Sequence, residues 1–340
     1  GPYSGERCTE TNRLLIRTAS NAYFPQVMSV ISLPARDEKI KEVVDQVWDF
    51  ISEVQSLDEL KYERKKAKVH PVLEGFSDEE ILEEIQGRHQ VLAGESKSVK
   101  LAELETLMAS HHQTLPSGLA LQGSTFFATE HPRSHWDRPW MQSINKVVLV
   151  HRLREVVALA GFTRFESQSP SIEGELEYSV TRAPIARELK WLPAIENRGE
   201  GIFLEFSTDE IHAWMGKPAV RKQGEELQRG FDCWLKDHPQ VHANFPGLAY
   251  IMLHSFSHLL ITAIALECGY PASSIRERIY AIPSKGYGVL LYTGTADAEG
   301  TLGGLIQVGK HIHEHIANAL RMGELCSNDP VCSTHAPDKR

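Results

Sequence analysis

The sequence predicts an α+β protein, in which a mixed α/β sheet packs against helices and carries an inserted acidic helical subdomain. Strand-like and helix-like stretches alternate in the last third of the chain. An acidic, helix-rich block separates two apolar regions. The chain of 340 residues is also longer than one hydrophobic core usually supports. We therefore expect an N-terminal extended segment at 1–36, an acidic helical insertion at 37–112, and a mixed α/β core at 113–340 with a truncated, cysteine-containing tail.

The first two predicted regions differ sharply in pattern. The stretch before Pro34 is rich in β-branched and aromatic residues, which favours extended structure. Apolar residues then recur at helical spacing through 40–54, which predicts an amphipathic helix. Ser77 followed by Glu80 forms a capping box that opens another helix, and a third is expected over 100–111.

Charge is concentrated in this helical block. The chain has a net charge of −9 from 45 acidic and 36 basic residues, and residues 37–105 contain 18 of the acidic and 10 of the basic ones. The remainder is nearly neutral. Bulk charge therefore neither supports nor excludes a DNA partner, because binding needs only a local basic stripe.

The middle of the chain predicts strands followed by helices. Residues 146–165 favour strands, although their periodicity also allows a strand and a helix. Residues 189–207 predict two strands joined by a turn at "ENRGEG". Ser207 with Glu210 caps a helix, and 222–238 continues as helix.

The last third predicts helices and a pair of strands. The apolar stretch 246–268 is interrupted by "HSFSH", and histidines at mid-span are costly in lipid, so we expect a buried helix and no membrane role. Pro271 marks a further helix entrance at 271–278. Strands are expected at 278–284 and 286–294, followed by a helix within 300–320.

The five cysteines suggest a cytoplasmic protein with a metal site near its ends. Their number is odd and their spacing irregular, and no signal peptide precedes the first structured segment, which fits a reducing cytosol. Structural zinc needs four ligands, and Cys326, Cys332 and Cys8 are candidates. The alternative is free thiols at exposed ends, because five residues separate Cys326 from Cys332.

Two groups of histidines are also considered as metal ligands. His254 and His258 lie one helical turn apart, so both rings could reach one metal ion. Since no acidic residue within this motif supplies a third ligand, hydrogen-bonded histidines of a buried helix are the favoured interpretation. The alternating histidines at 311–315 predict a solvated helix face.

Two carboxylates and several basic residues are the remaining candidates. Asp297 and Glu299 precede a glycine-rich helix entrance, which allows a metal-dependent nuclease or hydrolase as the alternative function. No Gly-Lys-Ser/Thr follows, so we do not expect ATP hydrolysis. Basic side chains interleaved with aromatic ones can grip phosphates and stack on bases. The predicted DNA-binding residues are Arg276, Arg278, Lys285, Arg182 and Arg187.

Several stretches together resemble one family: "RTASNAYFPQVMSVISLP", "HRLREVVALAGFTRF", "LHSFSHLLITAIALECGYPASSIRERIY", "GVLLYTGTADAEGTLGGL" and "CSNDPVCSTHAP". They are similar to the signatures of the DrmB proteins of DISARM anti-phage defence systems, with a helicase-associated domain. The resemblance implies a non-catalytic subunit beside a helicase of the DrmA type, in a complex that binds DNA. It also implies that this chain is a C-terminal portion, with the remaining ligands of a structural zinc ion outside it.

Overall fold

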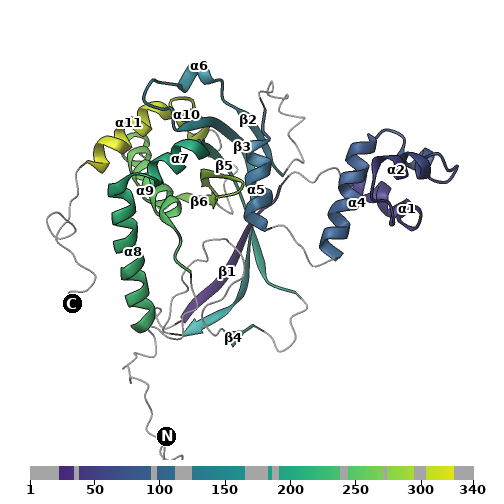
Figure 1. Cartoon of the computed structure of the whole chain (residues 1–340), viewed down its shortest axis with the longest axis horizontal. Helices are drawn as coiled ribbons and strands as arrows, with labels where there is room; N and C mark the ends of the chain where they lie inside the picture. Colours follow the sequence, from purple (N-terminus) through teal and green to yellow (C-terminus); the bar gives the residue numbers. More distant parts are fainter. Residues whose placement is uncertain are drawn as a thin grey trace, which may run out of the picture.

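A curled antiparallel sheet forms the centre of the protein (Figure 1). The computed structural model describes residues 23–33, 38–92, 98–111, 125–164, 183–185, 191–237, 244–269, 271, 274–294 and 304–324. The strands are β1 (Tyr23–Ile31), β2 (Phe127–Glu130), β3 (Ile144–Arg164), β4 (Ala183–Pro184), β5 (Ala194–Phe206), β6 (Ile275–Ile282) and β7 (Gly286–Thr293).

The helices fall into three groups. The first is α1 (Glu38–Ile51), α2 (Leu57–Arg64), α3 (His70–Leu73) and α4 (Asp78–Leu92). The second is α5 (Val99–Met108) and the short α6 (Arg133–Trp136). The third is α7 (Thr208–Met215), α8 (Pro218–Asp237), α9 (Leu248–Cys268), α10 (Gly304–Lys310) and α11 (Ile312–Gly323).

The strand order confirms the predicted α+β class. The main path runs β1-β3-β5-β7-β6, and β2 and β4 also pair with β3. All pairings recorded among the described strands are antiparallel, so the sheet expected to be mixed is antiparallel in this part of the chain. β6 ends the path and lies against α9.

Two glycines explain why the predicted "ENRGEG" turn is wrong. Residues Ala194–Phe206 form one continuous strand, β5, instead of two strands joined by a turn. A Cβ atom on Gly199 would lie 1.5 Å from the carbonyl oxygen of Thr293, and one on Gly201 would lie 2.8 Å from that of Leu291. These glycines therefore allow the backbone of β7 to approach β5, a role that the sequence does not distinguish from a turn.

The other predictions for the core are partly right. β3 is a single strand of 21 residues whose pairing with β5 shifts between Val150 and Leu153. No α-helix occupies the described residues of 271–278, because β6 already begins at Ile275. The helix expected within 300–320 is divided at His311 into α10 and α11.

Each face of the sheet has its own hydrophobic core. One face packs under α7, α9, α10 and α11, with side chains that include Val147, Ile202, Leu204, Leu253, Leu260, Ile279, Val289, Leu305 and Ile316. The opposite face packs under α5 and includes Leu104, Leu107, Val148, Phe203, Tyr280, Leu290 and Tyr292. Alternate residues of β6 and β7 consequently serve different cores.

The helices α1–α4 form a separate small core beside the sheet (Figure 1). It contains Val44, Val47, Ile51, Val54, Leu60, Val69, Leu73, Ile81 and Ile85. α5 also falls within the predicted 37–112 block, but Leu104 and Leu107 pack on the sheet. The acidic block therefore combines a helical unit with one helix of the main core.

The predicted capping box at the start of α4 is present. The Ser77 hydroxyl accepts from the backbone N–H of Glu80 at 3.2 Å, and the Glu80 carboxylate accepts from the backbone N–H of Ser77 at 2.8 Å. Ser207 also caps α7 with its hydroxyl, which accepts from the backbone N–H of Glu210 at 3.3 Å, but its own backbone N–H donates to the carbonyl oxygen of Ser143 at 2.8 Å. Both helix starts were therefore predicted from local sequence.

We expect Ser77→Ala to lower the stability of the α1–α4 unit by about 1 kcal/mol, because the Glu80 N–H loses its partner. Hydrogen exchange of the α4 amides measures this loss. Ser98→Ala is the matched control, since Ser98 occupies the N-cap of α5 and makes no side-chain capping bond there. Equal protection of α4 in the Ser77→Ala variant and the unaltered protein would contradict the prediction.

Helix α9 is long and apolar enough to cross a membrane, judged by length and composition alone. In the structure it packs against α11 and β6, and 39% of its most apolar window is buried. The predicted helix 246–268 is thus present, with one side against the sheet and another side exposed. Leu266, for example, is 74% exposed.

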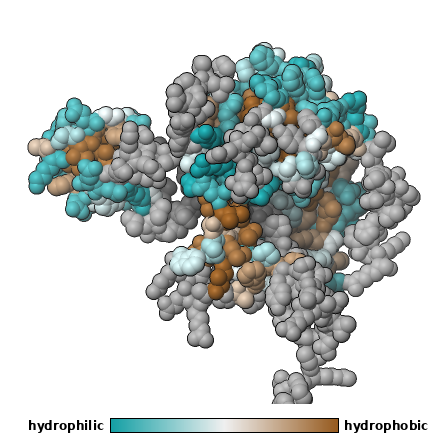
Figure 2. Space-filling view, turned by 180° about the vertical axis from the view of Figure 1, so that it is seen from behind, coloured by the Kyte–Doolittle hydropathy of each residue, from teal (hydrophilic) through white to brown (hydrophobic). Residues whose placement is uncertain are grey.

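The part of the sheet near β1 exposes apolar side chains to solvent. Figure 2 shows hydrophobic atoms gathered at the level of β1, below a more hydrophilic upper surface. Val27, Phe162 and Ile195, on β1, β3 and β5, are 48%, 40% and 59% exposed. Because these three exposed side chains are apolar, they add no positive charge to the surface.

Candidate metal centre

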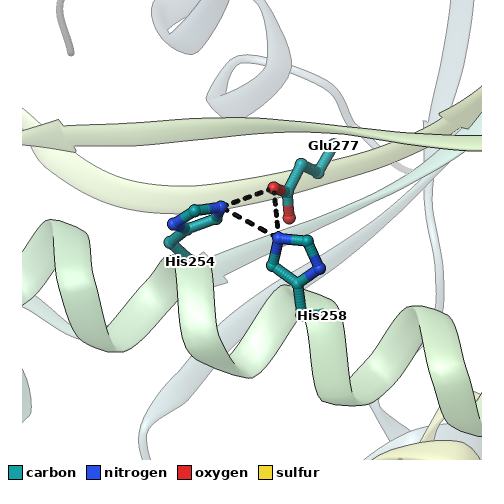
Figure 3. A group of neighbouring side chains, drawn as sticks. All are labelled: His254, His258 and Glu277. Atoms are coloured by element: carbon teal, nitrogen blue, oxygen red, sulfur yellow. Dashed lines mark hydrogen bonds and ion pairs between the residues drawn. The ribbon is translucent and has the colours of Figure 1, made fainter. Parts of the chain in front are cut away.

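Three side chains from α9 and β6 converge where the helix lies against the strand (Figure 3). His254 and His258 project from one side of α9, one helical turn apart. Glu277 is the third residue of β6 and faces the helix, because alternate strand residues point to opposite sides of the sheet. The fold thus supplies the acidic partner that the histidine motif itself lacks.

The distances within this group are short and nearly equal. Glu277 Oε1 lies 2.9 Å from His254 Nε2 and 3.1 Å from His258 Nε2. The two Nε2 atoms are 2.9 Å apart. The three atoms therefore form a small triangle of one carboxylate oxygen and two imidazole nitrogens, which are all ligand types that zinc accepts.

The second oxygen of Glu277 is held by a buried serine. The Ser257 hydroxyl contacts Glu277 Oε2, and its oxygen lies 2.7 Å from the carbonyl oxygen of His254. Ser257 is fully buried, whereas the His254 and His258 side chains are 43% and 65% exposed. The carboxylate is therefore anchored from inside the protein while the rings reach solvent.

Tyr250 lies next to this group on α9. Its ring centre is 5.7 Å from that of His254. Burial, together with the nearby negative charge of Glu277, raises the pKa of the Tyr250 hydroxyl above its usual value. Tyr250 is accordingly a neutral neighbour of the three side chains at physiological pH.

Arg276 and Arg278 point to the opposite face of β6 from Glu277. Arg276 Nη1 lies 2.6 Å from Glu155 Oε2, and the Arg276 side chain is 43% exposed. Arg278 Nε lies 2.7 Å from Glu103 Oε2, and the Arg278 side chain is only 10% exposed. Of these two predicted DNA-binding residues, Arg278 is thus committed to an ion pair inside the fold.

Glu103 is the centre of the inner ion pair. It accepts hydrogen bonds from the backbone N–H of Ile31 and the hydroxyl of Tyr280, each at 3.0 Å. Burial raises the pKa of the Glu103 carboxyl, although the charge of Arg278 acts in the opposite direction. Arg278 also donates to the backbone oxygen of Ser29 at 2.7 Å. The ion pair therefore connects α5, β1 and β6.

Glu155 is the centre of a second buried network. It accepts from Ser29 Oγ at 2.5 Å, Tyr292 Oη at 2.8 Å and Asn197 Nδ2 at 3.1 Å, besides Arg276. Burial alone would raise the pKa of the Glu155 carboxyl, but these hydrogen bonds outweigh it and the pKa is lowered. Burial and the Glu155 charge raise the pKa of Tyr292 to about 12. Glu155 is therefore held as a carboxylate.

The other predicted site residues have different outcomes. Lys285 lies exposed in the turn between β6 and β7. His315 is buried and its Nδ1 lies 2.6 Å from Glu267 Oε2, so the expected solvated face at 311–315 is wrong for this histidine. Seven predicted residues lie outside the described part of the chain: Arg182, Arg187, Asp297, Glu299, Cys8, Cys326 and Cys332.

Glu277 is the residue that sequence reasoning missed. It is 19 positions beyond His258, on a different element, and the histidine motif itself contains no acidic residue. The available signal was the alternation of β6, which places Glu277 on the same face as Ile275 and Ile279. An acidic residue between two core positions would have indicated a partner on the covering helix.

Comparison with known proteins found a matching family model and a similar curated protein. A family model described as the MrfA Zn-binding domain matches residues 256–336, from within α9 into the tail that contains Cys326 and Cys332. The chain is also 31% identical, over 98% of its length, to the DISARM protein DrmB of Bacillus paralicheniformis. It spans 59% of the length of that relative. The predicted resemblance is confirmed, and the matched domain points to zinc binding.

Proposed function

We propose that this chain, a relative of the DISARM protein DrmB, is a non-catalytic subunit of an anti-phage defence assembly. It would dock on a helicase subunit of the DrmA type in the cytoplasm and contribute to DNA binding. The observation that carries the proposal is the similarity over 98% of the chain. Because the chain spans 59% of that relative, the proposal concerns only the role of the region that the two proteins share.

The positions of the basic residues narrow the proposed DNA contact. Lys285 is exposed at the β6–β7 turn, and Arg276 is partly exposed on the same edge strand. Arg278 faces inward and is left out of the contact. The acidic α1–α4 unit would be kept away from the duplex, since its charge repels phosphate. The edge at β6 is therefore the proposed place for DNA.

A charge-neutralising substitution tests this placement. We expect Lys285→Gln to weaken DNA binding by the co-purified helicase assembly, and to reduce the slope of log affinity against log salt by about 1. The measurement is duplex binding across a salt series, with and without this chain. Arg276→Gln should act in the same direction, with a smaller effect because Glu155 already engages that guanidinium.

Lys65→Gln is the matched control, because Lys65 is exposed on the α1–α4 unit and carries the same charge. Its salt slope should equal that of the unaltered assembly. If Lys285→Gln and Lys65→Gln gave identical slopes, the β6 edge would not contact DNA. A helicase that co-purifies with the chain but binds DNA equally well without it would reduce the proposed role to a scaffold.

A further inference from the structure

We propose that His254, His258 and Glu277 bind a divalent transition-metal ion of the zinc class, at a site separate from the tail cysteines. This site is part of the described fold and comes from α9 and β6 alone. Its metal would have three protein ligands and an open position. The proposal does not depend on a role in defence or on DNA binding.

The possible positions of the protons on the two Nε2 atoms favour a cation between them and Glu277 Oε1. A neutral imidazole has one N–H, and its other nitrogen carries a lone pair. If both Nε2 atoms of His254 and His258 were protonated, both N–H groups would have to donate to the one oxygen Glu277 Oε1, and the two donor nitrogens would be crowded to 2.9 Å from each other. If only one were, the other lone pair would face Glu277 Oε1 at about 3 Å. A cation between the three atoms removes both conflicts.

The triangle is close to the size that a metal ion needs. Tetrahedral zinc with bonds of about 2.0–2.1 Å places its ligand atoms about 3.3 Å apart. The observed separations of 2.9, 2.9 and 3.1 Å therefore require each atom to move by only a few tenths of an ångström. The exposed rings of His254 and His258 can make this movement without disturbing the core.

The surroundings are those of a supported metal site. Ser257 is buried and contacts Glu277 Oε2 from inside the protein, so that Oε1 faces the rings. Two histidines and one glutamate form a ligand set used by catalytic zinc, in which a water or substrate takes the fourth position. Here the open side is toward solvent, because His258 is 65% exposed. An exogenous oxygen or nitrogen ligand could therefore reach the ion.

The test is metal binding by the whole chain. Metal-free protein is titrated with Zn²⁺, and then with Co²⁺, whose visible absorption reports the number and type of its ligands. The variants are His258→Ala and Glu277→Gln. Glutamine keeps the shape of the side chain but removes the charged ligand. His311→Gln is the matched control, because His311 is an exposed histidine outside the triangle. A Cys326→Ser, Cys332→Ser double variant removes thiolate ligands.

We expect the double cysteine variant to bind one equivalent of Zn²⁺ at the triangle. In that background His258→Ala and Glu277→Gln should each weaken this binding by at least about 100-fold, since loss of a supporting residue alone costs about 10–100-fold. His311→Gln should bind as its parent does. Zn²⁺ should raise the unfolding temperature of the parent and not that of the triangle variants.

Two results would overturn the proposal. One is Zn²⁺ affinity unchanged by both triangle variants, which would leave the group as hydrogen-bonded side chains. The other is a Co²⁺ spectrum unaffected by Glu277→Gln. Unfolding temperatures of the metal-free variants establish that they are folded. DNA binding is not part of the readout, so a failed metal test and a failed defence role are distinguishable.

Discussion

Replacing Arg278 with alanine should lower the free energy of unfolding by about 3–5 kcal/mol, the range expected when one partner of a buried ion pair is removed. Glu103 would be left buried, with hydrogen bonds from Ile31 and Tyr280 but no opposite charge at 2.7 Å. Arg278 also ties β6 to Ser29 of β1. Chemical denaturation monitored by circular dichroism measures the loss.

The pH dependence of this variant is a second signature. Without Arg278, the folded-state pKa of Glu103 rises further above the ordinary value of 4.5, because burial still raises it and the charge that opposes burial most strongly is gone, while the hydrogen bonds from Ile31 and Tyr280 remain. The folded variant then holds a proton that the unfolded chain releases. Stability is therefore lost as pH rises from about 4.5 through the raised pKa. The destabilisation should be smallest in acid and largest at neutral pH.

Two further variants separate the charge from the general effect of truncation. Arg198→Ala is the matched control, because Arg198 is 72% exposed and pairs with Glu196 at the surface. It should change stability by less than about 0.5 kcal/mol. Adding Glu103→Gln to Arg278→Ala should recover part of the loss and flatten its pH dependence. A loss that is the same at pH 4.5 and pH 7 would contradict the charge argument.

Gly199→Ala should be comparably damaging for a different reason. The new Cβ would lie 1.5 Å from the carbonyl oxygen of Thr293 and 2.5 Å from its carbonyl carbon. Both are backbone atoms, so no side-chain rotation relieves the clash, and β5 and β7 must separate locally. We expect a loss above the usual 1–3 kcal/mol of overpacking, seen as a lower midpoint of denaturation.

Gly87→Ala is the matched control for that experiment. Gly87 lies in α4, and a Cβ there would have nothing within 4 Å. Alanine should therefore stabilise α4 by about 0.5–1 kcal/mol through helix propensity. If Gly199→Ala were tolerated as well as Gly87→Ala, the close approach of β7 to β5 would not be a constraint on the fold.

Features that depend on neighbouring residues were predicted correctly from the sequence. Features that depend on contacts between distant residues were not. The caps at Ser77 and Ser207 and the helix α9 were predicted because each is determined by a few neighbouring residues. The glycines of "ENRGEG" were misread because a turn and a close strand approach require the same residue. Pro271 suggested a helix where β6 follows, since pairing with β7 overrides the local preference.

The residues of the candidate metal site were likewise only partly predictable from the sequence. His254 and His258 could be paired from sequence, because helical spacing fixes their relation. Glu277 could not be joined to them without knowing that β6 lies under α9. The arginines beside it were grouped by sequence as one basic cluster. Their actual roles depend on which face of the sheet each side chain occupies, and Arg278 faces inward.

The alternation of charge along β6 also protects the fold against mispairing. Glu277 faces the two histidines, and its neighbours Arg276 and Arg278 face Glu155 and Glu103 on the other side. A slip of β6 by one residue against β7 would exchange the faces. It would bring a carboxylate against buried carboxylates and an arginine against the histidine pair. A one-residue slip of β6 is therefore electrostatically unfavourable, in addition to the apolar side chains that it would move out of their cores.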